Sequence, residues 1–201
     1  MSDLFEDKAR DWDQRPGPQI ISEGVGAHLR KAVDWAPTMR VMDFGAGTGL
    51  VAGHVAPLVA HIAAVDVSPG MLEQLAAKTA LRGKVSIHCQ DILRQPLGER
   101  FDGIVSAMAM HHVEDTVGLL AAFRDHLVPG GFIAVADLDT EDGSFHPPEI
   151  EGVFHHGFDR RRLGALLGDA GFNDPRFVTA VEIRKESGHV YPVFLVTATR
   201  A

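Results

Sequence analysis

The chain has 201 residues, of which 45% are hydrophobic and 23% charged, and its formal net charge is −8. That length and composition fit one soluble globular domain with a sizeable core. The acidic balance argues against nucleic acid as the main partner, because phosphate binding needs a basic surface. The single cysteine, Cys89, excludes an internal disulfide and is expected to be a small core residue. Without a long apolar run or a signal-peptide pattern, we expect a cytoplasmic protein with no membrane partner.

The first 36 residues predict two helices. In residues 1–15, apolar side chains such as Phe5, Ala9 and Trp12 fall on one loose helical face. The Pro-Gly-Pro sequence at residues 16–18 is expected to end this helix. A second amphipathic helix is expected from about Gln19 to Trp35.

Residues 40–50 read Arg-Val-Met-Asp-Phe-Gly-Ala-Gly-Thr-Gly-Leu, which predicts a strand, a tight glycine turn and a helix. A glycine can adopt positive φ and lets the backbone approach a ligand closely. The dinucleotide-binding fingerprint would need another glycine at position 50, where the chain has Leu50. Asp43, two residues before the first glycine, would repel a pyrophosphate and suits a cationic group. An NAD-dependent oxidoreductase therefore fits this pattern less well, although it stays open as an alternative.

This pattern resembles motif I of the class I (Rossmann-like) S-adenosylmethionine (SAM) methyltransferases, in which the loop wraps the methionine end of the cofactor. The resemblance implies that the cofactor is SAM and the product S-adenosylhomocysteine. In the small-molecule methyltransferases, an N-terminal aromatic-Asp pair folds over the cofactor, and Trp12 with Asp13 fits that place; Trp12 packing on the domain is the alternative. The implied cofactor contacts of the loop are Asp43, Gly45, Ala46, Gly47, Thr48 and Gly49.

Residues 61–66 form a continuous apolar run that ends in Asp66, as expected for a buried parallel strand. A carboxylate at this strand end can accept hydrogen bonds from both ribose hydroxyls. Ser68 and Pro69 then predict the start of a helix that carries Met71. A third strand is expected at residues 85–88. The further cofactor contacts implied by the resemblance are Val67 and Met71 near the ribose, and Gln90, Asp91 and Ile92 around the adenine.

Residues 101–113 predict a fourth strand that runs into a loop, and Ala107 and Met108 are expected beside the transferable methyl group. His111 is the first candidate for a substrate contact or general base. In an extended segment, His111 and His112 would point in opposite directions, so both are not expected to hold one metal ion.

Helix periodicity covers residues 113–127, and Val-Pro-Gly-Gly at 128–131 is expected to end that helix. A buried strand at residues 132–136 then leads to Asp137. This helix-Pro-Gly-Gly-strand sequence also resembles the methyltransferase family.

A polar segment follows at residues 138–158, and a loop of this length inside a compact domain is usually functional. We expect it to form part of the acceptor pocket, with His146 and His155 as contacts. A zinc site is an alternative, but no metal is expected, because paired histidines at i, i+4 are missing. Asp159 should cap the next helix, and residues 176–183 and 189–197 predict a closing β-hairpin.

Together these elements predict an α/β fold: a doubly wound, mostly parallel, seven-stranded sheet with an N-terminal helical cap. The family resemblance implies the strand order 3-2-1-4-5-7-6 with the last strand antiparallel. We expect a single domain over residues 1–201, with a cap at 1–36 and an acceptor-side insertion at 138–158.

The implied activity is methyl transfer from SAM to a small molecule, similar to the methyltransferases of ubiquinone and menaquinone biosynthesis. The candidates for proton removal are His111, His155 and Asp137, and the chain is expected to be a monomer or homodimer. A non-catalytic SAM-binding module is the second alternative.

Overall fold

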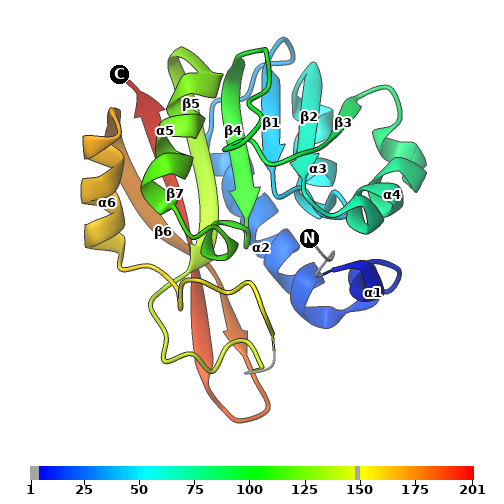
Figure 1. Ribbon diagram of the computed structural model, residues 1–201, viewed down its shortest axis with the longest axis vertical. Coiled ribbons are helices and arrows are strands. Elements are labelled where there is room, and N and C mark those ends of the chain that lie inside the picture. The colour runs from blue at the N-terminus through cyan, green and yellow to red at the C-terminus, as the bar shows by residue number, and fades with distance from the viewer. Residues whose placement is uncertain (1–4, 148–149) are drawn as a thin grey trace.

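A computed structural model describes residues 5–147 and 150–201; part of the expected first helix and part of the insertion lie outside these ranges. Within them, the centre of the protein is a sheet of seven strands in the order β3-β2-β1-β4-β5-β7-β6 (Figure 1). The strands are β1 Arg40–Phe44, β2 His61–Asp66, β3 Val85–Cys89, β4 Phe101–Ala107, β5 Leu127–Leu138, β6 Phe172–Arg184 and β7 Val190–Arg200.

Strands β1 to β5 pair in parallel, whereas β7 runs antiparallel to both β5 and β6. The predicted strand order and the antiparallel last strand are therefore confirmed. The strands alternate their side chains between two core clusters, one on each face of the sheet. In β1, for example, Val41 belongs to one cluster and Met42 to the other, as expected for a sheet that is covered on both faces.

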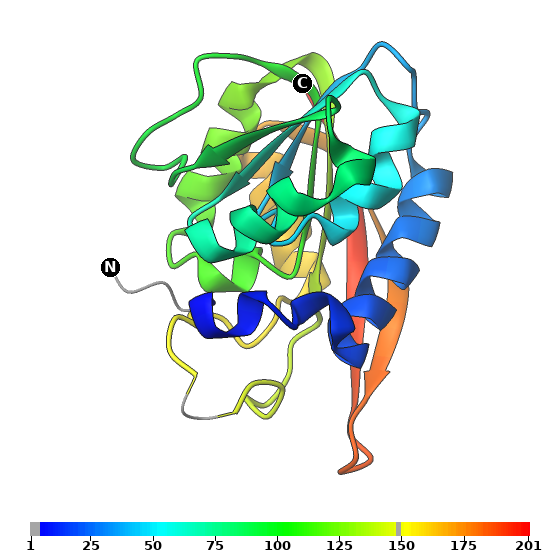
Figure 2. The same ribbon diagram turned by 90° about the vertical axis from the view of Figure 1, so that its right-hand side faces the viewer.

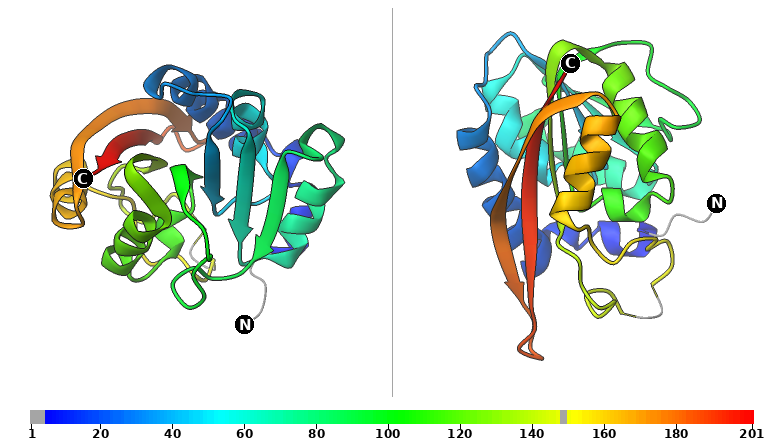
Figure 3. Two further views of the ribbon diagram at one scale, coloured as in Figure 1. Left: turned by 90° about the horizontal axis from the view of Figure 1, so that it is seen from above. Right: turned by 90° about the vertical axis from the view of Figure 1, so that its left-hand side faces the viewer.

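The helices cover both faces of the sheet (Figures 1 and 3). One core cluster holds α2 (Pro16–Ala32), α3 (Leu50–Val55) and α4 (Pro69–Ala77), and the other holds α5 (Thr116–His126) and α6 (Arg160–Asp169). The short elements are α1 Glu6–Ala9 and the 3₁₀ turns η1 Trp12–Gln14, η2 Ala56–Leu58, η3 Thr79–Leu81 and η4 Met110–His112.

Local sequence signals account for most helix starts. Ser68 accepts a hydrogen bond from the backbone of Met71, Asp115 from Gly118 and Asp159 from Arg162, so each caps its helix. The prediction for the N-terminal proline was wrong in one respect. Pro16 occupies the first turn of α2 and begins that helix, because a proline needs no backbone N–H there.

Other boundaries differ from those expected. Helix α2 ends at Ala32, three residues before Trp35, and α5 begins at Thr116 after its Asp115 cap. Cys89 is exposed and not a core residue, because it ends β3, a strand at the edge of the sheet.

The N-terminal segment and the 138–158 insertion come from distant parts of the chain, but they lie at the same end of the sheet, beneath the carboxyl end of β4 (Figures 1 and 2). The backbone N–H of Phe154 donates to the carbonyl of His111, and that of Phe158 donates to the carbonyl of Leu138. The insertion is thereby attached to the ends of β4 and β5, where ligands bind in open α/β sheets. None of the helices within residues 5–147 and 150–201 combines the length and the apolar composition of a membrane span.

Phe123 is the residue of α5 on which we expect the packing of that helix to depend most. It is fully buried, and its ring centroid lies 5.1 Å from that of Phe44 in an edge-on arrangement. Phe123→Ala should lower the free energy of unfolding by about 3–5 kcal/mol, measured by urea denaturation. Val117→Ala, on the exposed side of the same helix, should change it by less than about 0.5 kcal/mol. Equal effects of the two substitutions would contradict the packing described here.

Candidate active site

The glycine loop after β1 has the backbone conformation that its sequence predicts. Gly45, Gly47 and Gly49 have φ angles of 66°, 53° and 81°, which favour glycine. A Cβ atom at Gly45 would lie 2.2 Å from the Cβ of Ala109, whereas a Cβ at Gly47 would meet no atom within 4 Å. The loop therefore packs tightly against the segment after β4 on one side and faces open space on the other.

Asp43, at the end of β1, is 1% exposed, and its Oδ2 has no hydrogen-bond partner within the described part of the chain. Burial raises the pKa of this carboxyl to about 8; the nearby charge of Asp66 adds to the rise, and the backbone N–H of Ala52 partly offsets it. The carboxyl is therefore neutral at pH 7 in the cofactor-free protein, and a cationic group bound beside it would favour its charged form. The site therefore fits the ammonium-bearing end of an amino acid such as the methionine part of SAM.

Asp66 lies at the end of β2 and accepts hydrogen bonds from the backbone N–H groups of Gly47, at 2.7 Å, and Ser68, at 2.9 Å. It thus ties the glycine loop to the neighbouring strand, a structural role that the sequence did not reveal. Its position at the carboxyl end of a strand next to this loop is the one expected for a ribose contact.

The residues expected around the rest of the cofactor differ in exposure. Ile92 and Met71 are buried, whereas Val67 is exposed. Asp91 accepts a hydrogen bond from the backbone of Leu93 at 2.9 Å and so closes a turn after β3. The side chain of Gln90 donates to the carbonyl of Gln95 at 2.7 Å.

The predicted Trp12-Asp13 pair lies against the glycine loop mainly through Asp13. The Thr48 hydroxyl donates to one Asp13 carboxylate oxygen at 2.5 Å, and Lys78 contacts the other at 2.5 Å. Trp12 is half-buried and packs edge-on against Phe5, with 6.0 Å between the ring centroids. The hydrogen bond between Thr48 and Asp13 was not predicted, because a separation of 35 residues leaves no local pattern.

At the end of β4, Met108 has a φ of 56°, an uncommon conformation for a residue other than glycine, and its N–H donates to Ala136 at 2.9 Å. His111 follows in η4 and is 1% exposed. Its Nδ1 lies 2.7 Å from Oδ1 of Asp137, and its backbone N–H donates to Oδ2 at 3.1 Å. Asp137 therefore fixes both the position and the orientation of the His111 ring.

Two further histidines lie beside His111. Its Nε2 is 3.1 Å from Nε2 of His146, and the ring centroids of His111 and His112 are 4.1 Å apart. The prediction that His111 and His112 point in opposite directions was wrong, because residues 110–112 form a 3₁₀ turn and not an extended strand. Burial, followed by the neighbouring His111, lowers the pKa of both His112 and His146 to about 4.

His155 does not join this group through its side chain. Its Nε2 lies 3.0 Å from the Val113 carbonyl and 3.1 Å from the Thr116 hydroxyl. The imidazole therefore holds the insertion against the start of α5.

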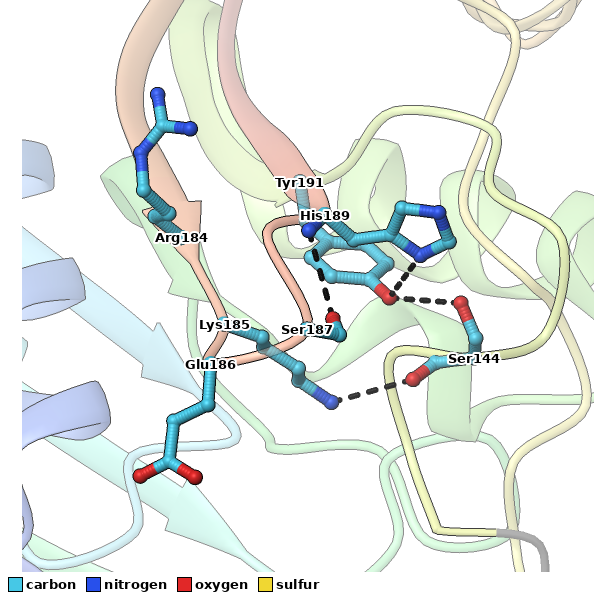
Figure 4. A pocket seen from close by; sticks show the side chains of 7 residues that line it. All are labelled: Ser144, Arg184, Lys185, Glu186, Ser187, His189 and Tyr191. Carbon is cyan, nitrogen blue, oxygen red and sulfur yellow. Dashed lines mark hydrogen bonds between the residues drawn. The ribbon is translucent and has the colours of Figure 1, made fainter.

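An opening of about 620 Å³ lies between the insertion and the tip of the β6–β7 hairpin (Figure 4). Tyr191 forms a hydrogen bond with Ser144 across it, and Lys185 donates to the carbonyls of Ser144 and Phe145. No predicted site residue lines this opening. We therefore place the candidate active site at the ends of β1, β2 and β4 and not here.

Comparison with known proteins identifies the family of the chain. Residues 41–131 match a family model described as a methyltransferase domain. An O-methyltransferase of Pyrenophora dematioidea is 30% identical over 198 residues, which cover 90% of this chain and 71% of that protein. An uncharacterized methyltransferase of Schizosaccharomyces pombe is 34% identical over 138 residues, 59% of this chain and 48% of its own length. The chain thus spans about half the length of the first curated relatives that it matches.

The fold also matches that of solved structures. An N-methyltransferase of Bradyrhizobium japonicum in complex with S-adenosylhomocysteine superposes with a TM-score of 0.71 at 16% identity, over 98% of this chain and 94% of that one. At this identity the likeness concerns the fold alone, and the O-methyltransferase relative carries the assignment of the family. The chain belongs to the class I SAM-dependent methyltransferases.

Proposed function

We propose that the protein transfers the sulfonium methyl group of SAM to a small-molecule acceptor in the cytoplasm. The observation that carries the proposal is the buried carboxylate of Asp43, which lacks a partner for Oδ2 among the described residues, beside a glycine loop with one open side. This pairing suits an amino-acid ligand with a positive charge and disfavours a diphosphate. Because NAD carries a diphosphate, the alternative of an NAD-dependent oxidoreductase is disfavoured.

In this proposal the cofactor lies across the carboxyl ends of β1 and β2. The glycine loop and Asp43 hold the methionine part, and Asp66 accepts hydrogen bonds from the ribose hydroxyls. Asp91 and Ile92 contact the adenine, because a carboxylate accepts well from an exocyclic amine. The remaining contacts come from Val67, Met71, Gln90, Ala107 and Met108.

The acceptor is proposed to bind on the other side of the same edge, against His111, His146 and Trp12. SAM supplies a methyl carbon that is already electrophilic, so the protein has mainly to align the acceptor and exclude water. An acceptor that must lose a proton would be served by His111. Asp137 accepts a hydrogen bond from Nδ1–H of this ring, so the lone pair lies on Nε2, the nitrogen that faces His146. This is the arrangement of a general base with its orienting carboxylate. The contacts of His155 favour a role in positioning the insertion and not in proton transfer.

The cap and the insertion are proposed to close the site from two sides. The hydrogen bond between Thr48 and Asp13 draws the cap onto the cofactor loop, and the carbonyl of His111 anchors the insertion. Enclosure of this kind keeps water from the reacting atoms and holds donor and acceptor in line.

The activity is testable with SAM that carries a radiolabelled methyl group, incubated with the protein and a panel of small hydroxylated, amine and thiol compounds. We expect label to move to at least one compound. Binding of SAM without transfer to any compound or cell extract would instead indicate a non-catalytic SAM-binding module. Absence of SAM binding would overturn the proposal.

Asp66→Ala should weaken SAM binding by about 1.5–3 kcal/mol, or roughly 10- to 150-fold in the dissociation constant, because a charge-assisted acceptor is lost. Isothermal titration calorimetry measures this change. Asp125→Ala, which removes an exposed acid of α5, is the matched control and should leave the dissociation constant unchanged. An unchanged constant for Asp66→Ala would contradict the ribose assignment.

Asp43→Asn should change how stability depends on pH in the cofactor-free protein. Because the folded pKa of Asp43 is raised to about 8, its contribution to stability is complete below its ordinary pKa of 3.8 and disappears as pH rises through 8. Since asparagine stays neutral, the variant should gain roughly 4 kcal/mol in unfolding free energy relative to wild type between about pH 5 and pH 8.5. Chemical denaturation at both pH values measures this difference. Parallel pH profiles would show that the Asp43 carboxyl is not neutral in the folded protein.

A further inference from the structure

We propose that His111, His112 and His146 form a binding site for a divalent transition-metal ion of the zinc type. The inference goes beyond methyl transfer, because the donor chemistry of SAM requires no metal. It rests on the geometry of three side chains whose convergence the family assignment does not explain.

The three rings already lie close to the arrangement that a metal ion needs. One ring nitrogen from each histidine lies within 4.8 Å of those of the other two. Nε2 of His111 and Nε2 of His146 are 3.1 Å apart. Two nitrogen ligands of a tetrahedral zinc ion are ~3.3 Å apart, given Zn–N bonds of about 2.0–2.1 Å. This pair therefore has nearly the right spacing, and His112 supplies a third ring nitrogen within 4.8 Å of both.

Hydrogen bonds orient two of the rings for this purpose. Nδ1 of His111 is bonded to Asp137 at 2.7 Å, and Nδ1 of His112 is bonded to the carbonyl of Gly152 at 2.7 Å. Each oxygen accepts a hydrogen bond from Nδ1–H, so the lone pair of each ring lies on Nε2. Metal-binding histidines are held in this way by carboxylates and backbone carbonyls in known metal sites. Aromatic neighbours also confine the rings: Phe5 meets His112 edge-on at 5.4 Å, and Phe145 meets His146 edge-on at 4.9 Å.

The donor set defines the class of metal. Three neutral imidazoles suit Zn²⁺ and the neighbouring late transition metals, whereas Mg²⁺ and Ca²⁺ prefer oxygen ligands. Three protein ligands also leave the fourth position of a tetrahedral ion open for water or for an oxygen of the acceptor. The ion would take the same Nε2 lone pair of His111 that the general-base role uses, so only one of the two roles can operate at a time.

The expectation of no metal followed from the absence of histidines at i, i+4. The ligands here come from different sources: two adjacent residues in the turn after β4, and one residue 35 positions later in the insertion. Sequence spacing alone does not reveal such a site.

The test uses the full chain without a histidine tag, stripped with a chelator and titrated with Co²⁺ and then Zn²⁺. We expect one equivalent of Co²⁺ to give the visible absorption bands of a four-coordinate ion, and Zn²⁺ but not Mg²⁺ to displace it. His146→Ala and His112→Ala should each weaken Zn²⁺ binding by more than about 100-fold, because loss of a ligand should exceed the 10- to 100-fold effect of losing a supporting partner.

His156→Ala is the matched control, because this histidine belongs to the same insertion and its side chain is 61% exposed. It should leave the Zn²⁺ affinity unchanged, and circular dichroism checks that every variant is folded. Equal Zn²⁺ binding by wild type and a folded His146→Ala variant, or the same loss in His156→Ala, would overturn the proposal. The titration needs neither SAM nor acceptor. A protein that does not bind Zn²⁺ could therefore still transfer methyl groups, and a protein that transfers no methyl group could still bind Zn²⁺.

Discussion

The buried carboxylate of Asp43 is the constraint on which the architecture of the site depends. Placing an acid at the end of a central strand costs free energy, because its charged form is desolvated and one oxygen lacks a partner in the described residues. A core position with no function would be filled by an apolar residue, as Val41 and Met42 are in the same strand. In the proposed function, a cationic group of the cofactor would supply the missing partner and offset this cost.

Hydrogen bonds of other carboxylates connect neighbouring segments of the chain around the glycine loop and the turn after β4. Asp66 ties the glycine loop to β2, and Asp13 connects the loop to the N-terminal cap. On the side proposed for the acceptor, Asp137 orients His111, whose carbonyl in turn anchors the insertion. Carboxylates thus position both halves of the site through hydrogen bonds to neighbouring backbone or side-chain groups, which agrees with the acidic composition of the chain.

The sequence predicts the sheet well because each signal is local. The apolar run that ends in Asp66 has the bounds of β2 as the structure has them, and Ser68 and Asp159 cap the expected helices. The glycine loop was predictable for the same reason, since positive φ restricts the choice of residue. The boundaries of α2 and α5 were less accurate, because helix ends depend on tertiary packing as well as periodicity.

The arrangement of the acceptor side was harder to predict. His111, Asp137 and His146 could be named as candidates, but their contacts depend on how the turn after β4 faces an insertion that follows β5. Whether His111 and His112 diverge or converge depends on the backbone of η4, and no residue in that turn specifies its conformation unambiguously. The hydrogen bond between Thr48 and Asp13 is similarly non-local. The hydrogen bonds that Lys185 and Tyr191 of the hairpin form with Ser144 of the insertion are non-local too.

The close approach of Gly45 to Ala109 has a consequence for how this protein can diverge. There is no room for a methyl group on Gly45, and Ala109 already directs its own methyl group at that position. A larger side chain at either residue would push the glycine loop and the segment after β4 apart. Among descendants of this chain, the two positions should therefore evolve as a coupled pair, and under the proposed function a change of acceptor should arise in the insertion, outside that contact.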